Sequence, residues 1–80
     1  MSGYYHIEIM DCDPKVSDQV DTICKTLNDT TCDITSSWTD VEDVELDHIE
    51  IDLPENKFTT FMIAFCNHIQ RNRYYKMTIS

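Results

Sequence analysis

Two identical short segments carry the side chains most suited to metal or acid–base chemistry. The segments His6–Ile9 and His48–Ile51 both have the sequence His-Ile-Glu-Ile. Side chains two positions apart in a strand lie on the same face, so each segment offers one imidazole and one carboxylate on one side. Two imidazoles with two carboxylates are ligand types that suit zinc or iron. The candidate metal ligands are therefore His6, Glu8, His48 and Glu50.

A polar sheet surface that faces solvent or a partner is the alternative interpretation of these side chains. A repeated strand would produce the pairing whether or not a metal binds, and side chains that project in parallel from a sheet rarely surround an ion without a ligand from a loop. Asp11, Cys12 and His68 could complete a site, but no spacing requires them. We therefore expect no cofactor, and the metal site stays an alternative.

The two segments repeat at an offset of 42 positions, and the apolar residues that follow them coincide at the same offset. Val20 aligns with Met62, and Ile23 aligns with Phe65. Two strand–helix–strand units predict one α+β domain, residues 1–80, with the ferredoxin-like βαββαβ (split βαβ) arrangement and a pseudo-two-fold internal repeat. This arrangement has a four-stranded antiparallel sheet with two helices on one face. We place the first and third strands side by side at its centre and expect those two to run parallel.

Hydrophobic periodicity predicts where the elements lie. Alternating apolar residues predict strands at Tyr4–Cys12, Thr31–Trp38, Val44–Leu53 and Tyr74–Ile79. Asp13 and Pro14 predict the start of a first helix, and Asp52 with Glu55 fits a capping box before the second. The third strand changes phase near Asp47, which predicts a bulge or a late strand start.

The strand phases also predict the two sides of the sheet. We expect the centre of the core at Ile7, Ile9, Ile49 and Ile51. We expect the uncovered side to carry His6, Glu8, Met10, His48, Glu50 and Asp52, with Tyr74 and Lys76 nearby. The apolar helix faces are expected to bury Cys24 and Cys66 as small hydrophobic side chains.

The charge balance limits the choice of partner. Fifteen Asp and Glu residues against six Lys and Arg residues give the 80-residue chain a net charge of −9. Such a field repels nucleic acids and anionic membranes and favours a basic protein surface. We therefore expect no direct binding to either. Met1–Tyr5 lacks the features of a signal peptide and no apolar run could span a bilayer, which predicts a cytoplasmic protein with reduced thiols.

The segment Met10–Lys15 argues against several catalytic and cofactor chemistries. Its position resembles that of the metal loop in heavy-metal-associated domains, which carries Met-x-Cys-x-x-Cys, but Lys15 occupies the second cysteine position. One thiol cannot form a two-thiolate site. Acidic neighbours raise the pKa of a thiol, which disfavours Cys12 as a nucleophile. Asp11 and Asp13 also oppose phosphate binding of the acylphosphatase kind, so we predict that the protein is not an enzyme.

The densest charged feature is a run without Lys or Arg, formed by Asp40, Glu42, Asp43, Glu45, Asp47, Glu50 and Asp52. Alternate carboxylates along a strand lie roughly 7 Å apart on one face, a spacing similar to that of phosphates along a nucleic-acid strand. In size and charge the chain resembles small phage-encoded inhibitors such as anti-CRISPR and anti-restriction proteins. The run therefore predicts a nucleic-acid mimic that occupies a basic channel of a nuclease, or of a CRISPR or restriction component. A solvated hairpin rim is the simpler interpretation.

A structural or regulatory adaptor, monomeric or homodimeric, is the second functional interpretation. It would associate through the open sheet face or through an edge strand. Aromatic residues and methionine are enriched at interface centres, and the candidate anchors are Tyr4, Met10, Trp38 and Tyr74. Association of this kind is expected to depend weakly on salt.

Overall fold

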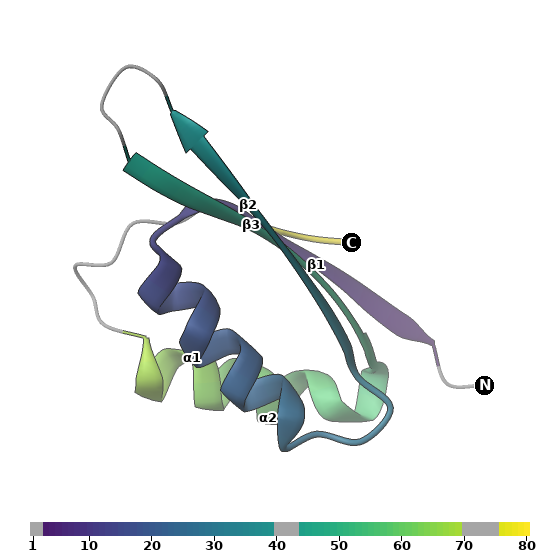
Figure 1. Cartoon of the computed structure of the whole chain (residues 1–80). Coiled ribbons are helices and arrows are strands. Elements are labelled where there is room, and N and C mark those ends of the chain that lie inside the picture. The colour runs from purple at the N-terminus through teal and green to yellow at the C-terminus, as the bar shows by residue number, and fades with distance from the viewer. Residues whose placement is uncertain (1–2, 40–43, 70–75) are drawn as a thin grey trace.

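The fold follows from two strand–helix–strand units that share one sheet (Figure 1). The computed structural model describes residues 3–39, 44–69 and 76–80, without the side chains of residues 37–39 and 44. The elements are β1 (Tyr4–Cys12), α1 (Pro14–Lys25), β2 (Thr31–Thr39), β3 (Val44–Pro54), α2 (Glu55–His68) and β4 (Lys76–Ile79). The strand order is β2-β3-β1-β4, every neighbouring pair is antiparallel, and both helices cover one face. The predicted ferredoxin-like α+β fold is confirmed. Within the described residues, neither helix is both long and apolar enough to cross a bilayer.

The two central strands run antiparallel, so the prediction that they run parallel is wrong. The α1 crossover returns the chain to run β2 in the direction of β1, and the β2–β3 hairpin then reverses it. The register places Ile7 opposite Ile51, Ile9 opposite Ile49, and Glu8 opposite Glu50. Each copy of the repeated segment therefore meets the other copy in reverse order.

The two helices begin in different ways. Asp13 is the N-cap of α1, where its Oδ1 accepts a hydrogen bond of 2.8 Å from the backbone N of Lys15, as predicted. At α2 the N-cap is Pro54, which has no side-chain cap bond among the described residues. Asp52 stays in β3, so the predicted capping box is wrong.

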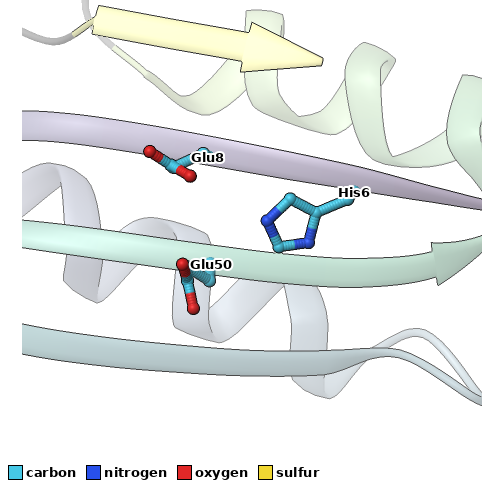
Figure 2. Close-up of side chains that lie close together, drawn as sticks. All are labelled: His6, Glu8 and Glu50. Carbon is cyan, nitrogen blue, oxygen red and sulfur yellow. The ribbon is translucent and has the colours of Figure 1, made fainter. Parts of the chain in front are cut away.

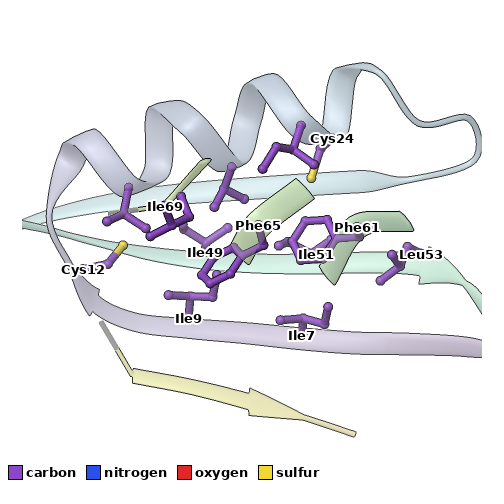
Figure 3. Close-up of a cluster of buried hydrophobic side chains, with 13 residues drawn as sticks. Ile7, Ile9, Cys12, Cys24, Ile49, Ile51, Leu53, Phe61, Phe65 and Ile69 are labelled. Atoms are coloured by element: carbon purple, nitrogen blue, oxygen red, sulfur yellow. The ribbon is translucent and has the colours of Figure 1, made fainter. Parts of the chain in front are cut away.

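The core lies between the sheet and the two helices (Figure 3). The four isoleucines of the repeated segments are fully buried in it, as predicted: Ile7, Ile9, Ile49 and Ile51. Phe61 and Phe65 of α2 pack with their ring centroids 6.0 Å apart, and α1 contributes Val16 and Val20. Burial of these apolar side chains is the main stabilising contribution to a domain of this size.

Asp47 explains the apparent change of phase in the third strand. Its side chain takes an inward position of β3 and is 5% exposed. The Ser17 hydroxyl donates to its Oδ2, and the Ser36 hydroxyl donates to its Oδ1 over 2.8 Å. The phase of β3 is therefore continuous, and the prediction of a bulge there is wrong. The irregularity lies in β1 between Ile9 and Cys12, where Asp11 has a φ of 54°.

All four cysteines are free thiols. Cys24 is buried as predicted, whereas Cys66 is exposed, so that prediction is wrong for Cys66. Cys12 is fully buried and its Sγ donates to the carbonyl oxygen of Asp47 over 3.3 Å. Burial, reinforced by the nearby charges of Asp47, Asp13 and Asp11, raises the pKa of Cys12 to about 11. The expected rise in the pKa of this thiol is confirmed, with burial as its largest cause.

Alkylation with iodoacetamide at about pH 8 is expected to modify Cys66 well before Cys12 in the folded protein. A thiol with a pKa of about 11 is only about one-thousandth thiolate at that pH, and the thiolate is the reactive form. Peptide mass spectrometry over time would measure both rates. Unfolding in guanidinium should bring the two rates together, and early modification of Cys12 in the native protein would contradict its burial.

Candidate functional site

The sheet face turned away from the helices is the candidate site, and we call it the open face. Its side chains alternate along each strand with those of the core, so its members follow from the strand register. β1 and β3 contribute His6, Glu8, Met10, His48, Glu50 and Asp52, as predicted, and β1 also contributes Tyr4. The outer strands contribute Thr31, Asp33, Thr35, Lys76 and Thr78.

Three carboxylates cross the open face in one line, which we call the carboxylate row. Asp33 lies directly opposite Glu50, and Glu50 lies directly opposite Glu8. Figure 2 shows Glu8 and Glu50 on the two adjacent central strands. Like charges directly opposite each other destabilise a sheet. The row therefore lowers the stability of the unliganded fold, and a cation or a basic partner that neutralised it would be bound favourably.

His6 lies beside the carboxylate row and interacts with a fourth carboxylate. Its Nδ1 is 2.8 Å from Oδ1 of Asp52, the residue opposite it in β3. This hydrogen bond is the largest cause of a raised His6 pKa, and the charges of Asp52, Glu50 and Glu8 add to it against a smaller effect of desolvation. The surroundings of His6 thus favour a positive charge.

His48 lies close to both of the opposed glutamates. Its Nε2 is 3.7 Å from Oε1 of Glu50 and 3.9 Å from Oε1 of Glu8. One nitrogen or oxygen atom from each of His6, Glu8 and Glu50 lies within 4.8 Å of the others. The antiparallel register therefore brings His6 to both glutamates and His48 to the same two glutamates, in an arrangement that differs from the expected parallel one.

The three additional residues named from the sequence lie elsewhere. Cys12 is buried with its thiol on the Asp47 carbonyl. The Asp11 carboxylate is 3.7 Å from Nζ of Lys76. His68 ends α2 and lines a hollow of about 290 Å³ between the helices, away from the open face.

The predicted acidic run divides between the two sides of β3. Glu45 and Asp47 share the parity of the buried isoleucines, whereas Glu50 and Asp52 face the open side. Asp47 is buried and hydrogen-bonded, so it presents no carboxylate to a partner. The remaining predicted positions, Asp40, Glu42 and Asp43, lie outside the described residues.

Asp33 is a member of the site that the sequence analysis missed. It sits in the weakly patterned β2, where it faces Glu50 across the hairpin. Aligning the two hairpin strands in antiparallel register would have found it.

Of the predicted interface anchors, Tyr4 is 63% exposed and Met10 is half-buried. The side chain of Trp38 and the whole of Tyr74, the other two predicted anchors, lie outside the described part of the chain.

Comparison with known proteins supports the fold. No protein-family model and no curated protein matches the sequence. The crystal structure of a DUF3240 family protein from Shewanella baltica OS155 is similar over 99% of this chain and 89% of that chain, with a TM-score of 0.59 and 14% sequence identity. At this identity the similarity concerns the backbone arrangement alone, so the chain shares a ferredoxin-like α+β architecture with that protein.

Proposed function

We propose that the chain is a protein-binding module that inhibits a nucleic-acid-handling complex by docking its acidic surface where phosphates would bind. The observation that carries this proposal is the carboxylate row. It aligns Asp33, Glu50 and Glu8 across three strands. Asp52 lies beside the row, two positions after Glu50 on the same face of β3. A basic groove that accepts successive phosphates would meet a comparable set of negative charges on this face.

The spacing of the row supports joint action of its charges. Neighbouring strands lie about 4.8 Å apart, whereas the Debye length at physiological salt is about 8 Å. Adjacent carboxylates therefore present one combined field to a cationic surface. The net charge of −9 adds long-range attraction, which raises the association rate and makes binding weaken steeply with salt.

The proposed contact surface differs from the acidic run in the sequence. It retains Glu50 and Asp52, keeps Asp40, Glu42 and Asp43 as proposed contacts, and adds Glu8 and Asp33. It leaves out Glu45, because that residue has the parity of the buried isoleucines and does not share the open face. It omits Asp47, because that carboxylate is buried.

We propose a cytoplasmic location, which for a phage inhibitor is the host cytoplasm. Reduced thiols are the rule in that compartment, and the cysteines of this chain are free.

Self-association through the open face is the alternative, and the exposed Tyr4 is the feature that favours it. Two copies docked face to face would bring two carboxylate rows together. Such like-charge contacts cost energy in an interface. A partner with a basic surface is therefore the better complement of this face.

Affinity capture with matched baits tests the proposal. The bait Glu8→Gln/Asp33→Asn/Glu50→Gln removes the row, and the control Asp18→Asn/Asp21→Asn/Asp29→Asn removes the same charge from α1 and the loop after it. We expect wild type and control to capture the same basic nucleic-acid-binding protein from host lysate. The row variant should bind it about tenfold or more weakly.

The captured protein provides the decisive measurement. Fluorescence anisotropy with labelled DNA or RNA should show that wild-type protein displaces the nucleic acid, and that displacement weakens as salt rises. Equal binding by the row variant and the control would contradict the acidic-surface mechanism. A captured partner that keeps its nucleic acid in the presence of saturating protein would contradict inhibition by mimicry.

A further inference from the structure

The repeated His-Ile-Glu-Ile segment places two equivalent half-sites around one point of the open face. Glu8 and Glu50 lie directly opposite each other, and a histidine precedes each by two positions in strands that run antiparallel. The two imidazoles therefore flank the glutamate pair from opposite ends. We propose that the open face binds one divalent transition-metal ion of the zinc type between β1 and β3, with the ligands His6, Glu8, His48 and Glu50.

The distances place three of the proposed ligands together and the fourth, His48, beside two of them. Zinc bonds of about 2.1 Å in a tetrahedron imply ligand atoms about 3.4 Å apart. His48 Nε2 is already 3.7 Å from Glu50 Oε1 and 3.9 Å from Glu8 Oε1. These separations exceed those of a good hydrogen bond and approach the spacing of ligands that share an ion. The ligand atoms of His6, Glu8 and Glu50 lie within 4.8 Å of one another, and these side chains are partly exposed.

The contact between His6 and Asp52 gives a second, separate reason. Metal-bound histidines commonly donate the proton of their other ring nitrogen to a carboxylate, which fixes the tautomer and orients the ring. When His6 Nδ1 donates to Asp52 Oδ1, 2.8 Å away, the lone pair of Nε2 is left for a metal. Figure 2 shows the His6 ring between β1 and β3 beside Glu8 and Glu50. Asp52 belongs to neither half-site, so the repeat does not account for this contact.

The choice of metal follows from the ligands and their charges. Two carboxylates in direct opposition repel each other, and a doubly charged cation between them removes that repulsion. Two imidazoles among four ligands select zinc, copper, nickel or cobalt over magnesium and calcium, which prefer oxygen. This inference does not rest on the proposed inhibitory function, and its test requires no partner protein.

Titration calorimetry of tag-free, chelator-treated protein with Zn²⁺ tests the site. We expect one ion per chain, with no comparable heat from Mg²⁺. Glu50→Gln and His48→Gln should each weaken binding at least about tenfold, because loss of even an outer-shell partner of a ligand costs about 10–100-fold in metal affinity. His68→Gln should leave it unchanged, because His68 lies on the helix side. Zn²⁺ should also raise the thermal unfolding midpoint of the wild type and not that of Glu8→Gln/Glu50→Gln.

Cobalt distinguishes this site from a thiol site. The thiols of Cys24 and Cys32 share a side-chain hydrogen bond, so they are the alternative metal site. Co²⁺ bound by imidazole and carboxylate lacks the intense near-ultraviolet sulfur-to-cobalt band, whereas Co²⁺ bound at Cys24 and Cys32 would show the band and would lose it in Cys24→Ser/Cys32→Ser. Circular dichroism of every variant checks that it is folded. The proposal is overturned if no ion binds at millimolar Zn²⁺, if the sulfur band appears, or if the folded glutamate variant binds as wild type does.

Discussion

Replacing Phe61 by alanine is expected to lower the free energy of unfolding by about 3–5 kcal/mol. Phe61 is the largest of the fully buried side chains and lies in the core between α2 and the sheet (Figure 3). Its removal loses the apolar transfer energy of the ring and leaves a cavity that the neighbouring isoleucines fill only in part. Proteins are stabilised by roughly 0.05–0.15 kcal/mol per residue, so an 80-residue chain would lose a large share of its stability.

Ile63→Ala is the matched control for this prediction. Ile63 lies two positions further along α2 and is 57% exposed, so its truncation should change stability by no more than about 0.5 kcal/mol. Urea unfolding followed by far-ultraviolet circular dichroism would measure both variants. If Phe61→Ala is too unstable to give a folded baseline in the unfolding curve, Phe61→Leu should show a smaller loss in the free energy of unfolding. Equal effects at Phe61 and Ile63 would contradict the placement of the core.

Replacing Asp47 by alanine is expected to cost about 1.5–3 kcal/mol, the value of hydrogen bonds to a charged group. The Asp47 carboxylate joins three elements, because it lies in β3 and accepts hydrogen bonds from Ser17 of α1 and Ser36 of β2. Removing it leaves two hydroxyls without their charged acceptor and opens a small void beside the core. Guanidinium unfolding would measure the loss.

A double-mutant cycle separates the hydrogen bonds from the change in volume. Ser36→Ala alone and together with Asp47→Ala should give a coupling energy of about 0.5 kcal/mol or more. Asp33→Ala is the control, because Asp33 is an exposed β2 residue that faces the like charge of Glu50; its removal should be neutral or stabilising. An Asp47→Ala protein as stable as the wild type would contradict the proposed role of this carboxylate.

The sequence predictions succeeded where a residue interacts with a near neighbour in the chain and failed where its partner is far away in the sequence. The N-cap at Asp13 depends on a hydrogen bond to a residue two positions away, and the sequence predicted it correctly. The capping box at Asp52 failed because β3 continues to Pro54, which is the N-cap, and the Asp52 carboxylate instead contacts His6, 46 positions away. Asp47 was placed in a displayed acidic run because nothing near it in sequence shows that Ser17, 30 positions earlier, would accommodate it in the interior.

The repeated segment shows what the sequence determined by itself. The alternation of isoleucine with histidine and glutamate set which side chains are buried and which are exposed, since side chains two apart share a face in any strand. The sequence repeat also established the βαββαβ order and therefore the fold class. These features depend on local geometry, so they need no knowledge of the neighbouring strand.

Only the tertiary structure decided which side chains meet. The hairpin between β2 and β3 reverses the second copy of the segment, and this places Glu50 opposite Glu8 and adds Asp33 to form the carboxylate row. It also brings His48 to both glutamates and joins His6 to Asp52. Strand direction and register are set by the crossover, the hairpin and the shared core, which act between residues far apart in the chain. For this reason the composition of the site was visible in the sequence, whereas its geometry was not.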